Sequence, residues 1–255
     1  MRFKIIETGS KGNAYIVRSS GWSGLIDCGT GTYRRVCANL NENEKLNFAI
    51  FSHQHLDHYG DFHKVQFLEP LFLGGVAKIS ETVSISRFEV FHGILNYGYI
   101  VADFATSTAL VFAIDFFEIK PETLIAIKKT LRRFKYVIFA VELSFNEFIL
   151  QKMVREKEKY DFNDPNFLAV ASKISGLLRH CSDSLFCRYL SYWIKDVEFE
   201  YKIITLHKSS EGLQTAPTLS GWNNPKVPKN YFANIGLKKL FKNIQIGIDG
   251  AEIEI

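Results

Sequence analysis

Apolar, strand-like segments of this chain repeatedly stop at a histidine or an aspartate. The segments NFAIFSH, RFEVFH and YKIITLH end at His53, His92 and His207, and the segment TALVFAID ends at Asp115. In layered α/β proteins, sites are built where buried strands stop, because a rigid sheet holds the side chains and the loops leave room for a substrate. These four positions therefore indicate where a functional site lies.

The order of the predicted elements favours two packed sheets with helices outside them. Short apolar and β-branched segments punctuated by glycine and serine predict strands at 2–10, 13–19, 24–29, 47–52, 87–92, 97–103 and 108–115. Helical patterns occupy 33–46, 121–134, 145–160, 166–180 and 182–194, with strands at 135–142 and 201–207 and a hairpin at 244–255. Without repeats or long linkers, the sequence predicts one α/β domain over residues 1–255, an αββα sandwich.

Charge and cysteine usage bear on location and partners. The formal net charge of +4 is mild and fits a protein that handles anions without requiring nucleic acid. The four cysteines form no CxxC pair, which is typical of reduced thiols in the cytosol. The sequence has no signal-peptide pattern at its start and no apolar run near the ~20 residues of a membrane span. We therefore expect a cytoplasmic protein with no membrane partner.

The loop SHQHLDH places three imidazoles and a carboxylate within a few residues. Such groups are costly to bury unpaired, so they are either solvated residues gathered by chance or ligands. Residues two apart in an extended segment point the same way, so His53 and His55 can bind one ion side by side. Asp57 and His58 lie where the chain turns and can face a second ion. Imidazole suits zinc, and a carboxylate also accepts manganese or iron.

These motifs carry a resemblance that continues in order along the chain. SHQHLDH keeps every ligand position of an HxHxDH signature; GSKGNAYIV and GLIDCG precede it, and HGILNYGYIV, FAID, VIFAVE, RHCSDS and ITLHKSS follow it. In these motifs the chain resembles the metallo-β-lactamase superfamily. The resemblance implies a hydrolase with two divalent metal ions, zinc or alternatively manganese. It assigns one ion to His53, His55 and His92, the other to Asp57, His58 and His207, and the bridging position to Asp115.

The last two histidine motifs are similar to those of a phosphodiesterase branch of the superfamily. His180 and Ser182 stand between two predicted helices, and His207 and Ser209 follow a predicted strand. The branch includes ribonuclease Z, the YycJ/WalJ exonucleases and the phage anti-Pycsar cyclic-nucleotide phosphodiesterases, and length and spacing are most similar to the last two. We expect no long protruding arm of the kind that grips tRNA in ribonuclease Z. Departures from the family pattern beside the ligands, at Gly93, Phe116 and Lys208, leave the ligand set intact.

The resemblance also implies roles for residues beyond the metal ligands. His180 is the candidate donor of a hydrogen bond or proton to the phosphoryl or leaving oxygen, next to the catalytic carboxylates Asp57 and Asp115. Three further residues orient ligands or contact substrate: Asp27 as a buttress beneath the metal loop, Glu142 and Ser182.

Each of the later assignments has a plainer alternative that the sequence leaves open. His92 and His207 are alternatively satisfied core histidines, and Asp115 is alternatively a strand-end cap. For His180 the alternative is packing at a helix end.

The predicted activity is metal-dependent hydrolysis of a nucleotide phosphodiester. We expect a 3′,5′-cyclic mononucleotide, as in phage counter-defence, which would place a phage-encoded protein in the host cytoplasm. The alternatives are a YycJ-like DNA or RNA exonuclease, a glyoxalase- or lactonase-like hydrolase, and a degenerate fold used as a binding module. The intact ligand set disfavours the binding module, the His180–Ser182 element disfavours the glyoxalase type, and the mild charge and compact length favour a small nucleotide.

A basic segment near the end of the chain leaves the partners open. Residues 223–243 interleave lysines with aromatic residues. Such a pattern grips nucleic acid by charge and stacking, but it is also typical of a solvated amphipathic helix. A third possibility is packing at a dimer interface near a neighbouring active site. We expect a homodimer.

Overall fold

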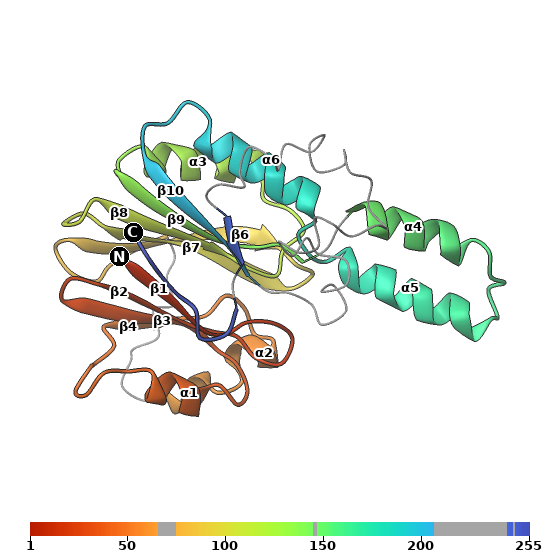
Figure 1. Cartoon of the computed structure of the whole chain (residues 1–255), viewed down its shortest axis with the longest axis horizontal. Helices are drawn as coiled ribbons and strands as arrows, with labels where there is room; N and C mark the ends of the chain where they lie inside the picture. Colours follow the sequence, from red (N-terminus) through yellow and green to blue (C-terminus); the bar gives the residue numbers. More distant parts are fainter. Residues whose placement is uncertain (66–74, 145–146, 207–243, 247) are drawn as a thin grey trace.

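Two β-sheets form the centre of the computed structural model, which describes residues 1–65, 75–144, 147–206, 244–246 and 248–255 (Figure 1). The five-stranded sheet has the order β12-β1-β2-β3-β4, with β1 (Arg2–Glu7), β2 (Ala14–Ser19), β3 (Trp22–Cys28), β4 (Phe48–Ile50) and β12 (Glu252–Glu254). The seven-stranded sheet has the order β11-β10-β9-β8-β7-β6-β5, with β5 (Val76–Lys78), β6 (Val83–Phe91), β7 (Leu95–Asp103), β8 (Thr108–Ala113), β9 (Tyr136–Glu142), β10 (Glu200–Leu206) and β11 (Ile244–Ile246). His207, Lys208, Ser209 and segment 223–243 lie outside the described residues.

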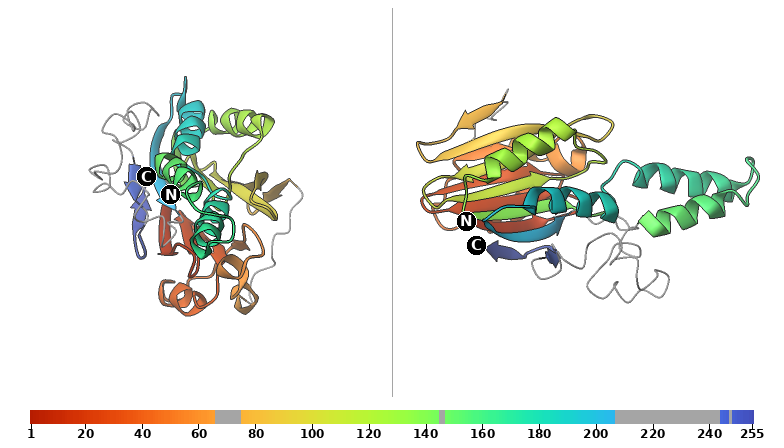
Figure 2. Two further views of the ribbon diagram at one scale, coloured as in Figure 1. Left: turned by 90° about the vertical axis from the view of Figure 1, so that its right-hand side faces the viewer. Right: turned by 90° about the horizontal axis from the view of Figure 1, so that it is seen from above.

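Helices cover the outer faces of both sheets. The helices of the described chain are α1 (Tyr33–Ala38), α2 (Leu56–Tyr59), the 3₁₀ turn η1 (Phe62–Lys64), α3 (Pro121–Leu131), α4 (Glu147–Lys157), α5 (Pro165–Leu177) and α6 (Asp183–Ile194), of which α4 and α5 do not cover a sheet. In Figures 1 and 2, α3 and α6 lie over the seven-stranded sheet and α1 lies beneath the five-stranded sheet. Among the described residues, no helix combines the length and the apolar character needed to cross a bilayer.

The core has three layers because successive residues of a strand face opposite sides of its sheet. On β8, Leu110 and Phe112 lie in the layer between the two sheets. Val111, on the opposite face of the same strand, packs in a second layer with Leu131 of α3 and Leu190 of α6. A third layer lies under α1. The predicted αββα sandwich is therefore confirmed.

Strands that run in the same direction bring their carboxyl ends to one edge. β3 pairs with β4 in parallel, β8 pairs with β9 and β9 with β10 in parallel, and β6 runs like β8 because both are antiparallel to β7. Asp27 and Asp115 at this edge have positive φ angles of 57° and 51°. That conformation costs an ordinary residue roughly 1–3 kcal/mol and is often kept at functional sites.

Three local expectations differ from the structure. The helical pattern at 33–46 forms a helix only over Tyr33–Ala38. The predicted C-terminal hairpin is wrong, because β11 extends the seven-stranded sheet beside β10 while β12 pairs with β1 in the other sheet. The expectation that no arm protrudes is also wrong, because α4 and α5 form a helical pair that extends away from both sheets (Figures 1 and 2). Leu150, Met153 and Ile174 pack within this pair.

Candidate metal centre

The loop after β4 presents its polar side chains in two directions. His53 and His55 lie side by side, with 2.9 Å between His53 Nε2 and His55 Nδ1. The short helix α2 then begins at Leu56, and its turn carries His58 into the interior. Gly29 allows this loop to approach the end of β3, because a Cβ at Gly29 would lie 2.0 Å from the carbonyl oxygen of Asp57.

The first cluster joins His53, His55 and His92 to Asp115, with one ligand atom from each lying within 4.8 Å of the others. Asp115 Oδ2 is 3.5 Å from His53 Nε2 and 3.9 Å from His92 Nε2. Four ligands placed tetrahedrally at ~2.0–2.1 Å from a zinc ion lie roughly 3.3 Å from one another. The donor set and its spacing therefore fit a zinc-like ion.

The second cluster joins Asp57 and His58 to the same Asp115. His58 Nε2 is 3.5 Å from Asp57 Oδ2 and 3.0 Å from Asp115 Oδ2. The remaining predicted ligand of this cluster, His207, lies outside the described residues. Because Asp115 faces both clusters, the arrangement is able to hold two ions with one carboxylate between them.

The ring nitrogens that face away from Asp115 have their own partners. His58 Nδ1 donates to Asp27 Oδ2 at 2.8 Å, and His92 Nδ1 donates to the carbonyl oxygen of Arg179 at 3.0 Å. Ser52 Oγ lies 3.0 Å from His53 Nδ1, while the Ser52 amide donates to Asp27. Such outer hydrogen bonds fix the tautomer and direct the other nitrogen toward a metal. Asp27 thus contacts both the ring of His58 and the backbone of the loop that carries His53.

Electrostatics at the centre suit cations. Burial lowers the pKa of His53 to about 2, so its ring is neutral and has a lone pair to offer. Burial also lowers the pKa of His92. At His58 burial acts in the same direction, but the carboxylates of Asp115 and Asp27 outweigh it and raise its pKa well above the ordinary value. A cation is therefore favoured between Asp115 and His58, and metal binding there requires the release of a proton.

His180 lies beside the clusters and is held by Glu142. His180 Nδ1 is 2.7 Å from Glu142 Oε1 and 3.5 Å from Asp115 Oδ1. Glu142 is fully buried, and its other oxygen accepts from the amide of Phe116 at 2.8 Å. Asp115, Glu142 and His180 are also close enough to form a third possible metal group. Ser182, the remaining predicted residue, caps α6 by accepting from the amide of Leu185.

Two asparagines support the centre and were not predicted from the sequence. Asn13 Nδ2 lies 3.0 Å from His58 Nε2 and 3.2 Å from the carbonyl oxygen of Asp57. Asn96 Nδ2 donates to the carbonyl oxygens of Ile114 and Asp115 and so holds the turn that carries Asp115. The GSKGN motif was the available signal for Asn13. No local signal marks Asn96, because its partners lie in the turn that follows a different strand, β8.

We expect Asp27→Asn to weaken metal binding roughly 10- to 100-fold, because the uncharged amide no longer orients and polarises His58. Competition with a chromogenic chelator measures this affinity. Asp61→Asn is the matched control, since Asp61 is also buried but accepts hydrogen bonds from Gly31 and Lys64. Equal affinities in the two variants would argue against the supporting role of Asp27.

Comparisons with known proteins agree with this fold. A family model described as the metallo-beta-lactamase superfamily matches residues 8–70, which include SHQHLDH. No curated protein matches the sequence significantly.

Three solved structures share the architecture over nearly their whole length. The metallo-beta-lactamase fold protein YhfI from Bacillus subtilis has a TM-score of 0.61 and 13% sequence identity, with 99% of each chain covered. The short form of human tRNase Z has a TM-score of 0.60 and 12% identity, with 100% of this chain and 99% of that chain covered. A diphosphatase of the PhnP family has a TM-score of 0.58 and 12% identity, with 100% of this chain and 97% of that chain covered. At these identities the likeness establishes the fold alone. The chain therefore has the metallo-β-lactamase fold, with a His/Asp cluster able to bind metal ions.

Proposed function

We propose that this protein is a binuclear metal-dependent phosphodiesterase whose substrate is a 3′,5′-cyclic mononucleotide. The observation that carries the proposal is the position of Asp115 between two metal-competent clusters, with His180 on its other oxygen. The structural neighbours named tRNase Z and diphosphatase support phosphate ester chemistry on this fold.

In this proposal each side chain has a distinct task. His53, His55 and His92 hold one divalent ion, zinc or alternatively manganese. Asp57, His58 and His207 hold the second, with Asp115 shared. When bound, such ions supply a nucleophile at neutral pH and neutralise charge that develops on the phosphoryl group. Asp27 and Glu142 keep His58 and His180 oriented.

In this proposal His180 serves the leaving oxygen of the diester. Its Nδ1 is engaged by Glu142, and 20% of its side chain remains exposed. The Glu142 carboxylate holds the imidazole in one orientation, from which we propose that it gives a proton or hydrogen bond to the departing alkoxide.

The arm of α4 and α5 bears on the choice between a mononucleotide and a polymer. It is inserted between Glu142 and His180, so both of these residues lie at its base. An arm beside the site favours a nucleic acid substrate, as in a YycJ-like exonuclease. However, basic and acidic residues alternate along its α4 side, at Arg155, Glu156, Lys157, Glu158 and Lys159. A polyanion is gripped by a surface of one sign, so this alternation favours the small substrate.

A substrate panel at two salt concentrations tests the proposal. We expect metal-dependent hydrolysis of at least one 3′,5′-cyclic mononucleotide, with little change between ~50 and ~200 mM salt because few phosphates are contacted. An enzyme that tracks a polyanion would lose affinity steeply over this range. Degradation of single- or double-stranded DNA or RNA with no turnover of any cyclic nucleotide would instead establish the exonuclease alternative.

A homodimer, a cytoplasmic location and a single domain over residues 1–255 complete the proposal. The homodimer is proposed from the basic segment 223–243, the cytoplasmic location from the cysteine usage, and the single domain from the absence of long linkers in the sequence.

A further inference from the structure

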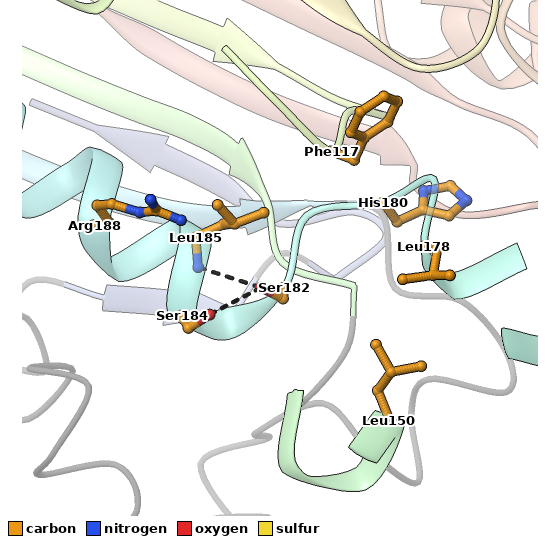
Figure 3. A pocket seen from close by; sticks show the side chains of 8 residues that line it. All are labelled: Phe117, Leu150, Leu178, His180, Ser182, Ser184, Leu185 and Arg188. Atoms are coloured by element: carbon orange, nitrogen blue, oxygen red, sulfur yellow. Dashed lines mark hydrogen bonds between the residues drawn. The ribbon is translucent and has the colours of Figure 1, made fainter. Parts of the chain in front are cut away.

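A pocket of about 310 Å³ shares His180 with the surroundings of the candidate metal centre. Figure 3 shows the side chains that line it. It is lined by Phe117, Leu150, Leu178, His180, Ser182, Ser184, Leu185 and Arg188. These residues come from the turn after β8, from α4, from the segment between α5 and α6, and from the first turns of α6 itself. His180 belongs to both places, since its Nδ1 lies 3.5 Å from Asp115 Oδ1 while its side chain lines the pocket. A group bound in the pocket would therefore lie close to a phosphate held at the candidate metal centre.

The lining of the pocket is unsuited to an anion. Four of its side chains are aliphatic or aromatic, and Arg188 is the one arginine or lysine among the residues that line it. The amino end of α6 offers little to a phosphate, because Ser182 Oγ already accepts from the Leu185 amide at 3.3 Å and pairs with Ser184 Oγ at 3.2 Å. Polyphosphate sites depend instead on several cations or uncapped helix amides.

A flat, uncharged group with a polar edge fits this lining better. The ring of Phe117 provides an aromatic face, with the ring of Phe91 behind it at 6.2 Å between centroids. Arg188 is exposed and has no hydrogen bond or ion pair within the described part of the chain, so its forked donors are available. Nucleobases combine a face that stacks on aromatic rings with an edge of hydrogen-bond acceptors.

The size of the pocket limits what it takes. Small-molecule sites span ~300–1,000 Å³, so this pocket is at the low end and has room for a single nucleoside-sized group. We propose that it is the nucleobase subsite of the enzyme, with Phe117 stacking on the base and Arg188 donating to its acceptor edge. Guanine, whose O6 and N7 accept a bidentate arginine, is the preferred base. This inference rests on the proposed function in assuming that a bound nucleotide is hydrolysed. Binding of the base in the pocket does not depend on that reaction and is tested separately.

Calorimetric binding to the zinc-loaded full-length protein tests the subsite. The probes are the four nucleoside 5′-monophosphates and ribose 5-phosphate, which has the same phosphate and no base. We expect Phe117→Ala to weaken binding of the nucleotides roughly 5- to 100-fold, while ribose 5-phosphate binds as before. Arg188→Met, which keeps the apolar stem of an exposed residue, should reduce the preference for guanosine monophosphate. Arg132→Met, an exposed arginine at the opposite end of β8, is the matched control and should change nothing.

The outcomes separate this inference from the proposed function. Nucleotide affinities that stay unchanged in both variants overturn the subsite, even if a cyclic nucleotide is hydrolysed. An equal loss for ribose 5-phosphate also overturns it, because the pocket would then hold the phosphate. If the variants lose affinity for nucleotides but not for ribose 5-phosphate, and the protein hydrolyses no phosphodiester, the subsite is supported and the proposed reaction is contradicted.

Discussion

Asp115→Asn is expected to remove most of the bound metal and to lower hydrolysis roughly 10³-fold or more. The Asp115 carboxylate faces both ligand clusters and supplies a charge that an amide lacks. Elemental analysis of protein purified without chelators should find close to two transition-metal ions per unaltered chain. The variant should hold fewer than one, because losing the shared ligand weakens both positions together.

A buried aspartate elsewhere in the same sheet provides the control for this result. Asp103 is 1% exposed at the far end of β7 and accepts hydrogen bonds from Ser19 and Trp22. Asp103→Asn should lower the thermal midpoint yet keep two metals per chain. Asp115→Asn with an unchanged metal content would show that Asp115 is a strand-end cap rather than a bridging ligand.

Much of the centre was predictable because its residues are marked locally. His53, His55, Asp57 and His58 lie in one loop, and the geometry of an extended segment followed by a turn already separates them into two directions. His92 and Asp115 each follow an apolar segment, and strands that run the same way bring such positions together. These features depend on short-range sequence, and the structure reproduces their convergence.

Other features depend on contacts that no short segment contains. Asn96 has the sequence context of an ordinary strand residue, and only the pairing of β7 with β8 brings it to the turn before Asp115. The Asp249–Gly250 signal did predict a turn, but each flanking strand finds a free edge in a different sheet. The arm was missed because the apolar faces of α4 and α5 are satisfied by each other, and their periodicity does not reveal whether they pack on a sheet.

The arm is inserted at the pair formed by Glu142 and His180. Glu142 and His180 flank the insertion, so its length and charge can change while the carboxylate–imidazole pair at its base remains intact. Because a fold alone does not determine function, we expect substrate choice to depend on the residues at the base of the arm. Phe117 and Arg188 line the pocket at this base together with His180 and do not belong to the candidate ligand set.

His180→Ala is expected to keep both metals and to lower the rate of diester hydrolysis roughly 10²- to 10⁴-fold. His180 follows α5 and is bound by Glu142, whereas His92 follows a strand and its ring lies 5.2 Å from that of His180. His92→Ala is therefore the informative comparison, since it removes a similar ring from the adjacent position and should release one metal ion. Metal content and rate are measured on both variants.

The leaving group distinguishes proton donation from simple positioning. A p-nitrophenyl ester departs without needing a proton, so a general acid is far less important for it than for a ribose alkoxide. The deficit of His180→Ala should therefore shrink on the p-nitrophenyl substrate, and Glu142→Gln should show the same pattern in a milder form. If His180→Ala loses metal as severely as His92→Ala, His180 is a ligand, and the third group of Asp115, Glu142 and His180 becomes part of the metal centre.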